Sequence, residues 1–311
     1  MKIGIDMMGG DFAPEEALSG IQQYLDEGDA HIVMVGNQSI LESLLTQVSI
    51  PENSYTIVNA TQVIDMHDHP ARALKEKPQS SIAIGFQLLA NGETDAFISA
   101  GNTGAMLVGS LYALKPIEGV LRPTISTIIP KENGATGLLL DVGLNSDCKP
   151  EHLNQFAIMG SVYAQAILGI ENPRVALINI GEEEGKGNLL AQATYPLLKN
   201  NNHINFIGNI EGRDVFLDKA DVLVCDGFNG NIILKLAESL FDITSRKGIK
   251  DEYFDRFNFE NYGGTPVLGI SKPVVIGHGI SKGKAFKNMI LLAQKMIEKD
   301  VMQKLQTELM A

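Results

Sequence analysis

Short apolar runs rich in β-branched residues alternate with amphipathic helical patterns along the chain, and this alternation restricts the fold more than any other feature. The runs are continuously apolar, which is typical of parallel strands that helices cover on both faces. Strands are predicted at residues 3–6, 32–35, 56–59, 96–99, 124–129, 137–141, 175–180, 204–207, 222–225 and 274–277. Helices are predicted at residues 15–25, 39–45, 81–89, 152–168, 189–198, 231–241 and 285–302. We therefore expect an α/β fold with a mostly parallel sheet, forming a single large domain over residues 1–311.

The charge balance and the cysteine content narrow the range of partners and compartments. The chain has 25 basic and 37 acidic residues and a net charge of −12, so we expect no nucleic-acid partner. The two cysteines, Cys148 and Cys225, lie far apart and lack metal-ligand spacing, which favours a reducing compartment. We find no signal-peptide pattern and no apolar run that reaches the length of a membrane span. The expected location is the cytoplasm.

Polar or glycine-rich turns follow several of the predicted strands. Parallel sheets place ligands beyond the carboxyl ends of their strands, which is where these turns occur. Such clustering exceeds what connecting turns require, and it predicts a ligand site at that edge. The turns begin with Asp6 and continue at residues 99–104, 141–145, 181–186, 226–231 and 278–282.

The turn after the strand at residues 96–99 points to an anion. Gly101 and Gly104 flank Asn102 and Thr103 where a strand meets a helix, so backbone N–H groups can approach a phosphate or a carboxylate. Together with Asp6, these residues are predicted to bind phosphate or substrate. The alternative is a tight turn in which Asn102 and Thr103 only cap the helix.

Two further turns carry candidate catalytic residues. Lys186 lies between two glycines, from which its side chain can reach a phosphate or an acidic partner. Asn229 and Asn231 can donate to an oxyanion, and Lys235 follows Asn231 by one helical turn. The alternative is that these are capping residues with a solvated lysine, which would explain one amide but not the cluster.

The remaining candidates follow the strands at residues 137–141 and 274–277. Asp141 and Asn145 are predicted to bind phosphate or substrate, although turn and cap chemistry also accounts for them. His278 lies between glycines and is a candidate acid, base or oxyanion donor. His67 and His69 alone are too weak a pattern for a metal site, so we expect no metal.

Taken in order, these motifs resemble those of the bacterial phosphate acyltransferases of phospholipid synthesis, the acyl-carrier-protein:phosphate transacylases. The resemblance extends over nearly the whole chain. It rests on residues 7–14 (MMGGDFAP), 99–105 (SAGNTGA), 122–123 (RP), 140–143 (LDVG), 147–150 (DCKP), 179–188 (NIGEEEGKGN), 209–214 (NIEGRD), 225–231 (CDGFNGN) and 262–264 (YGG).

The resemblance implies an αβα sandwich related to the phosphotransacetylase and isopropylmalate-dehydrogenase folds. It implies transfer of a fatty acyl group from acyl-carrier protein to inorganic phosphate, giving acyl phosphate for phosphatidic acid synthesis. It also implies a homodimer, no cofactor, peripheral contact with the inner face of the membrane, and hand-off to a membrane glycerol-3-phosphate acyltransferase. Because the carrier is acidic, a local basic surface is expected, with Arg246, Lys247 and Lys250 as candidates.

The chain departs from the family in two places. Residues 278–282 read HGISK, whereas the family commonly has His-Gly-Ser-Ser-Asn there. The family also has a longer apolar helical insertion after the helix that carries Lys235. Two alternatives stay open: a phosphotransacetylase-like enzyme that uses acyl-coenzyme A, and a non-catalytic module that binds the carrier. Residues 244–261 suit a mobile or partner-facing segment, or one whose aromatics fold back on the core.

Overall fold

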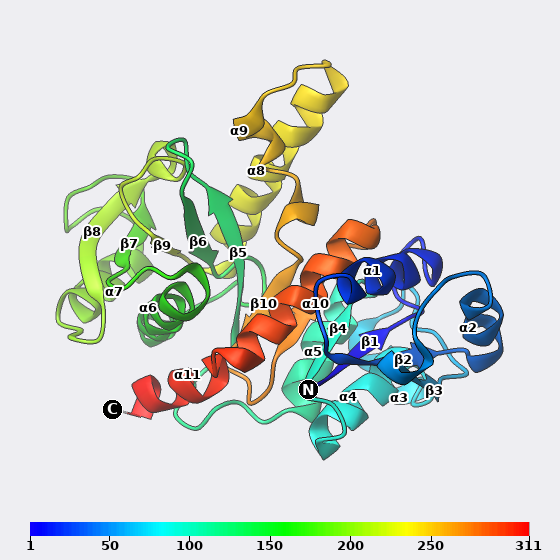
Figure 1. Ribbon diagram of the computed structural model, residues 1–311. Helices are drawn as coiled ribbons and strands as arrows, with labels where there is room; N and C mark the ends of the chain where they lie inside the picture. Colours follow the sequence, from blue (N-terminus) through cyan, green and yellow to red (C-terminus); the bar gives the residue numbers. More distant parts are fainter. Residues whose placement is uncertain (311) are drawn as a thin grey trace. The chain divides into compact units, whose positions relative to one another are not determined.

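The computed structural model describes residues 1–310, which fall into two compact units (Figure 1). Unit 1 comprises Met1–Pro116 and Phe259–Glu298, and unit 2 comprises Ile117–Asn258 and the chain from Lys299 onward. Each unit is therefore assembled from two separate stretches of sequence. We predicted a single acyltransferase domain over residues 1–311, and this stays a prediction.

Unit 1 contains a mostly parallel sheet whose strand order is β3-β2-β1-β4-β11-β10. All neighbouring pairs in it run parallel except β10 and β11, which are antiparallel. The central strands are buried because both faces of the sheet are covered. The bounds are β1 Lys2–Asp6, β2 His31–Gly36, β3 Tyr55–Asn59, β4 Ala96–Ser99, β10 Thr265–Leu268 and β11 Val274–Ile276.

The helices of unit 1 pack in pairs against this sheet. Helix α1 packs against α10, and α4 packs against α5 and β1. Gly20 permits the first pairing, since a Cβ there would lie 2.3 Å from the Cβ of Phe286. The bounds are α1 Glu15–Leu25, α2 Gln38–Leu45, η1 Glu52–Ser54, α3 Pro70–Glu76, α4 Ser81–Asn91, α5 Thr103–Ala113, η4 Phe259–Asn261 and α10 Gly283–Glu298.

The sheet strands of unit 2 lie in the order β5-β6-β9-β7-β8. Strands β5 and β6 form an antiparallel pair, and the other neighbours run parallel. The strand bounds are β5 Thr124–Pro130, β6 Thr136–Leu140, β7 Arg174–Asn179, β8 Asn205–Glu211 and β9 Val222–Val224. The helices are α6 Pro150–Tyr163, which continues into the π-helical turn η2 Ala164–Leu168, then α7 Leu189–Lys199, η3 Gly212–Asp214, α8 Gly227–Arg246, α9 Glu252–Asp255 and α11 Val301–Met310.

A buried ion-pair network joins the amino ends of β7 and β9 to the carboxyl end of the antiparallel strand β5. The Lys131 ammonium, 2% exposed, lies 2.6 Å from the carboxylate of Asp221 and 2.8 Å from that of Asp218. The Arg174 guanidinium binds the same two carboxylates. Burial raises the pKa of Asp221, but the hydrogen bonds from Arg174 and Lys131 outweigh burial and hold this pKa well below its ordinary value. This network is structural, because it lies at the strand ends opposite the predicted ligand site.

The structure confirms every predicted strand and corrects several helix boundaries. Strand β10 was not predicted, and neither was α3. The predicted helix at residues 231–241 begins earlier, at Gly227, and ends later, at Arg246. The predicted helix at residues 285–302 is two helices, separated at Asp300, whose φ is 51°.

The segment after α8 packs back on its own unit. Phe257 is buried, and its ring lies 5.2 Å from those of Phe216 and Tyr253, measured between centroids. The Arg256 guanidinium donates to the carbonyls of Lys131 and Ala135 at 2.9 and 2.6 Å. Of the two interpretations of residues 244–261, the structure therefore favours aromatics that fold back on the core.

Candidate functional site

In unit 1, three loops meet at the carboxyl ends of β1, β4 and β11. The buried carboxylate of Asp6 accepts hydrogen bonds from the Ser99 hydroxyl at 2.7 Å and the Met8 N–H at 2.9 Å. The Ser99 hydroxyl in turn accepts the N–H of Gly101 at 2.8 Å. The third loop joins them where the Asp11 N–H donates to the Gly279 carbonyl at 2.7 Å. The structure thus brings Asp6, Gly101 and the His278 loop together.

Asp6 is the centre of this arrangement. A Cβ on Gly9 would lie only 2.3 Å from its Oδ2 and 2.7 Å from the Gly101 nitrogen, so glycine is required there. Burial raises the pKa of Asp6, and hydrogen bonds from Ser81 and Ser99 only partly oppose this rise. The carboxyl group is enclosed by protein donors and acts by holding the loops in place.

Asn102 caps α5 and also holds a neighbouring loop. Its side-chain oxygen accepts the Ala105 N–H at 2.9 Å, and its amide donates to the carbonyls of residues 65, 66 and 68. A Cβ on Gly104 would lie 2.4 Å from Cγ of Pro70, so this glycine serves close packing. Thr103 is the member of the motif whose side chain is exposed to solvent. His278 is half-buried, with its ring 4.4 Å from that of Phe259.

In unit 2, the turn after β6 is built around Asp141. Its buried carboxylate accepts the N–H groups of Gly143, Leu144 and Asn145 at 2.8–3.0 Å, and the Asn145 side-chain amide at 2.6 Å. The same amide donates to the Pro123 carbonyl at 2.8 Å. Burial raises the pKa of Asp141 despite these hydrogen bonds. Asp141 and Asn145 therefore order the turn.

The first turn of α8 lies against this turn. The Gly227 N–H donates to the Asn145 carbonyl at 2.8 Å, and a Cβ on Gly230 would lie 1.8 Å from the Asp141 carbonyl oxygen. Both glycines therefore allow the backbone segments to touch. The Asn231 side-chain amide donates to the Val142 carbonyl at 3.1 Å. Asn231 is thus fixed beside the turn, and one of its two amide hydrogens is used.

The other candidates of unit 2 have different surroundings. The Asn229 amide donates to the Asp226 carboxylate, the cap of α8, at 2.7 Å. The Lys235 ammonium pairs with Glu238 at 2.8 Å. Lys186 is exposed, and no ion pair of its side chain occurs within residues 1–310. Helical spacing correctly placed Lys235 one turn after Asn231, but it did not reveal that Glu238 binds it.

A mainly apolar pocket of about 390 Å³ opens beside Asn229, between the end of β7 and the first turns of α7 and α8. Its polar lining comes from Asn179, Asn188, Asp226 and Asn229. Two of its apolar lining residues are exposed to solvent: Ile180 is 79% exposed and Ile232 is 53% exposed. The apolar lining consists chiefly of Leu153, Leu177, Ile178, Ile180, Leu190, Ile232 and Ile233. The sequence did not locate this pocket.

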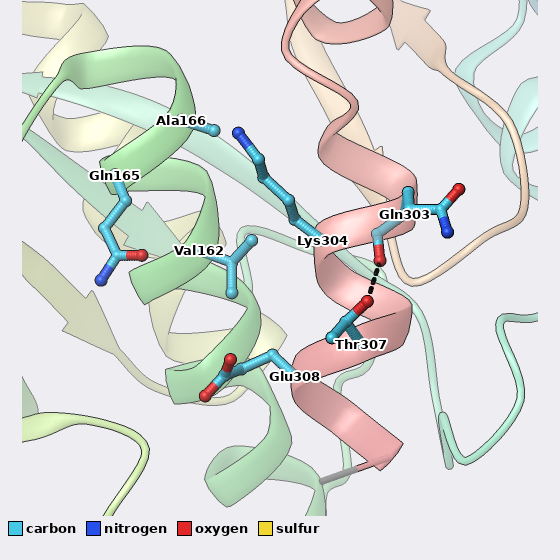
Figure 2. Close-up of a pocket in the computed structure, with 7 residues that line it drawn as sticks. All are labelled: Val162, Gln165, Ala166, Gln303, Lys304, Thr307 and Glu308. Carbon is cyan, nitrogen blue, oxygen red and sulfur yellow. Dashed lines mark hydrogen bonds between the residues drawn. The ribbon is translucent and has the colours of Figure 1, made fainter.

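A second pocket, of about 310 Å³, lies between α6 and α11 (Figure 2). Its walls carry a mixture of amide, charged and small apolar side chains, and the Thr307 hydroxyl turns back to the Gln303 carbonyl at 3.0 Å. Its lining residues are Val162, Gln165, Ala166, Gln303, Lys304, Thr307 and Glu308. None of the predicted site residues lines it, so we do not assign the reaction to it.

Both thiols are poor nucleophiles in their surroundings. Burial, reinforced by the carboxylates of Asp141 and Asp226, raises the pKa of Cys148 to about 12. Burial also raises the pKa of Cys225 well above its ordinary value. Neither side chain is held as a thiolate near neutral pH. Within residues 1–310, no group of three or more histidine, cysteine or acidic side chains is arranged to hold a metal ion.

Comparison with known proteins agrees with the motifs. The sequence model of the fatty acid synthesis protein family matches residues 1–253 and 246–304. A phosphate acyltransferase from Dictyoglomus turgidum is 44% identical, with 98% of this chain and 96% of the relative covered. One from Thermoanaerobacterium thermosaccharolyticum is also 44% identical, with 99% and 97% covered. The aligned lengths of 325 and 329 positions exceed the 311 residues of this chain, so these relatives contain residues that it lacks.

Solved structures of low identity support the fold. A phosphotransacetylase from Streptococcus pyogenes matches with a TM-score of 0.67 and 19% identity, covering 96% of this chain and 94% of the other. A 4-hydroxythreonine-4-phosphate dehydrogenase from Klebsiella pneumoniae matches with a TM-score of 0.55 and 15% identity, covering 94% and 98%. The expected fold class is thereby confirmed. By its family match and by relatives aligned over nearly its full length, the chain belongs to the fatty acid synthesis protein family, together with the phosphate acyltransferases.

Proposed function

We propose that this chain transfers a fatty acyl group from the thioester of acyl-carrier protein to inorganic phosphate. A phosphate oxygen attacks the carbonyl carbon, the carbon–sulfur bond breaks, and the carrier leaves as a thiolate that takes up a proton. The acyl phosphate then serves phospholipid synthesis. The observation that carries the proposal is the 44% identity to phosphate acyltransferases over 98% of the chain.

The candidate residues take roles that their positions allow. Lys186 and the second amide hydrogen of Asn231 are donors for phosphate and for the oxyanion that develops on the carbonyl oxygen. Asn229 and Lys235 are bound to Asp226 and Glu238 and would have to exchange these partners in the complex. Catalytic hydrogen bonds often form only when substrate binds, so both stay candidates.

In unit 1, His278 is a candidate acid or base, and Thr103 offers its exposed hydroxyl and the start of α5 to an anion. Asp6, Gly101, Asn102 and Gly104 support this loop cluster through the contacts described above. Preorganised donors of this kind contribute most when their loops cannot rearrange. No metal or cofactor is invoked for the reaction.

The apolar pocket beside Asn229 is a suitable place for the acyl chain. Its volume of about 390 Å³ lies within the range of small-molecule sites, and its walls are mainly aliphatic. An apolar chain gains free energy by leaving water for such a surface. With the chain seated there, the thioester would lie close to the start of α8, where Asn229 and Asn231 are found.

The partners follow from charge and exposed apolar surface. The acidic carrier would meet Arg246, Lys247 and Lys250, which are exposed where α8 ends, beyond the sheet of unit 2 (Figure 1). A homodimer is supported by an exposed apolar stripe of Phe228, Ile232 and Leu236 along α8.

A cytoplasmic location with peripheral contact at the inner membrane face, and hand-off to a membrane glycerol-3-phosphate acyltransferase, complete the proposal. Within residues 1–310, no helix has the length and apolar character needed to cross a bilayer.

Release of free carrier thiol from a long-chain acyl carrier, measured with and without phosphate, tests this function. We expect phosphate-dependent release that needs no nucleotide and persists in EDTA. A clear preference for acyl-coenzyme A would favour the phosphotransacetylase-like alternative. Binding of the carrier without turnover would favour the non-catalytic module and contradict the proposal.

A further inference from the structure

Several main-chain donors at the carboxyl edge of unit 2 are already occupied by the chain's own side chains. Asn188 accepts the Ala191 N–H at the start of α7, and Asp226 accepts the Asn229 N–H at the start of α8. Asp141 occupies the N–H groups of the turn after β6. Two of these capping groups are carboxylates, which repel an anion. A phosphate dianion bound here therefore needs cationic side chains.

Many cations of unit 2 already bind acidic side chains or carbonyl groups. Ion pairs engage Lys131, Arg174, Lys199, Arg213, Lys219 and Lys235, and Arg256 donates to two carbonyls. Arg246, Lys247 and Lys250 lie at the far end of α8, and Lys299 and Lys304 belong to the C-terminal stretch. At the carboxyl edge, Arg122, Lys149 and Lys186 have no ion pair among the residues that the structure describes. Lys186 already has a proposed role.

Arg122 and Lys149 flank one turn. Nη1 of Arg122 lies 3.5 Å from Oδ1 of Asn145, which is long for a hydrogen bond and leaves the other guanidinium donors to solvent. The neighbouring Pro123 carbonyl holds the Asn145 amide at 2.8 Å. The turn continues to Lys149, whose N–H donates to Nδ1 of His152 at 3.0 Å in the first turn of α6.

The positive charges of both cations act on His152, in the first turn of α6. Burial is the main cause that lowers the pKa of His152, and the positive charges of Arg122 and Lys149 lower it further. Asp147 and Glu151 are the exposed acidic residues of this turn and helix start, and neither forms an ion pair with the two cations within residues 1–310. The same turn contacts Asn231 through the Val142 carbonyl.

We propose that Arg122 and Lys149 bind a phosphate oxyanion beside Asn231. This inference rests on the proposed function and assigns to it a cationic site that the strand-end motifs alone did not identify. The planar guanidinium can donate two parallel hydrogen bonds to phosphate, and Lys149 adds a point charge. Two sources have this chemistry: free inorganic phosphate, or the phosphodiester on the prosthetic arm of the acyl carrier.

The experiment compares Arg122→Gln, Lys149→Gln and Arg122→Lys with two controls, Arg72→Gln and Lys299→Gln, which alter exposed cations that are not part of the turn. The readouts are KM for phosphate, KM for the acyl carrier, and the melting temperature. We expect Arg122→Gln to raise KM for phosphate at least tenfold without lowering the melting temperature. Added guanidinium ion should restore part of the loss, which a merely structural role would not allow.

Each outcome decides the matter. A rise in KM for the carrier alone supports the site and identifies the phosphodiester as its ligand. Unchanged KM values for both substrates overturn the proposal. Arg122→Lys, which keeps the charge, replaces Arg122→Gln if the latter fails to fold. If the wild-type chain shows no phosphate-dependent turnover, the proposed function fails, and calorimetric binding of inorganic phosphate to wild type and Arg122→Gln then tests the site by itself.

Discussion

The Asp141 carboxylate holds Asn145 twice, through its main-chain N–H at 2.8 Å and its side-chain amide at 2.6 Å. Two residues that the sequence suggested as substrate ligands thus bind each other. Their effect on the reaction is through the shape of the turn, which positions Asn231 on one side and Arg122 on the other.

Replacing Asp141 should therefore lower the stability of the chain, and it should not act through a lost contact with substrate. Asp141→Ala leaves several buried donors without an acceptor, and each costs about 1–3 kcal/mol. We expect a loss of at least about 3 kcal/mol in the free energy of unfolding, measured with urea. Asp147→Ala, an exposed carboxylate of the same turn, should change it by less than about 0.5 kcal/mol. A stable Asp141→Ala variant with a raised KM for phosphate would instead indicate direct contact with substrate.

Removing a proposed oxyanion donor should lower turnover without unfolding the chain. Lys186→Ala and Asn231→Ala should each reduce kcat on the order of 10²-fold, because one preorganised donor typically contributes that much. Steady-state assay of thiol release measures this, and circular dichroism checks the fold. Lys299→Ala, another exposed lysine of unit 2, serves as the control. Near-normal kcat/KM in both site variants would show that these residues are structural.

Acyl transfer should proceed without an acyl-cysteine intermediate. The pKa of Cys148 is raised to about 12, so the thiolate is scarce at pH 7. Cys148→Ala, with or without Cys225→Ala, should keep substantial turnover, although removal of the buried Cys225 thiol costs some stability. Intact-protein mass spectrometry after incubation with acyl donor and no phosphate should detect no acyl adduct. An adduct on either cysteine would disprove direct attack by phosphate.

Because of the buried network around Lys131, the free energy of unfolding should fall as the pH becomes acidic. The pKa of Asp221 lies below its ordinary value in the folded chain. Its contribution to stability is therefore complete above about pH 5, and it is lost as the pH falls through the ordinary pKa toward the folded pKa. Lys131→Met should cost on the order of 3 kcal/mol near neutral pH, since it leaves a buried carboxylate short of one partner.

Urea unfolding at pH 7 and at pH 3 measures this effect. The difference in the free energy of unfolding between wild type and Lys131→Met should be smaller at pH 3 than at pH 7. Lys199→Met, which removes an exposed ion pair, should cost no more than about 1 kcal/mol at either pH. If this difference between wild type and Lys131→Met did not change with pH, then Lys131 would stabilise the chain by packing and not by its charge.

The strands could be predicted because each one is a continuous apolar run, and burial on both faces leaves that pattern in the sequence. Strand β10 was missed because it follows Gly263 and Gly264 and contains Pro266, which weaken a strand pattern. The start of α8 was missed because Gly227 and Gly230 are typical of a loop. In the structure, both glycines are needed where the helix contacts the main chain of Asn145 and Asp141.

The strand-end location of the candidate residues could also be predicted, but their hydrogen-bond partners could not. Asn102 donates to residues more than thirty positions earlier, and Asn231 to Val142, 89 positions away. Such partners follow from tertiary packing alone. The role proposed for Arg122 could not be predicted for the same reason, since its surroundings are set by Asn145 and by the start of α6.

The division of each unit between two stretches of sequence has a consequence for how the chain is made. Strand β11 pairs with β4, and α10 packs on α1, so unit 1 cannot complete its sheet or cover α1 until residues 259–298 have been synthesised. Unit 2 has most of its sheet and helices available earlier and waits only for α11. During translation, the middle of this chain can fold while its beginning is still exposed on the ribosome.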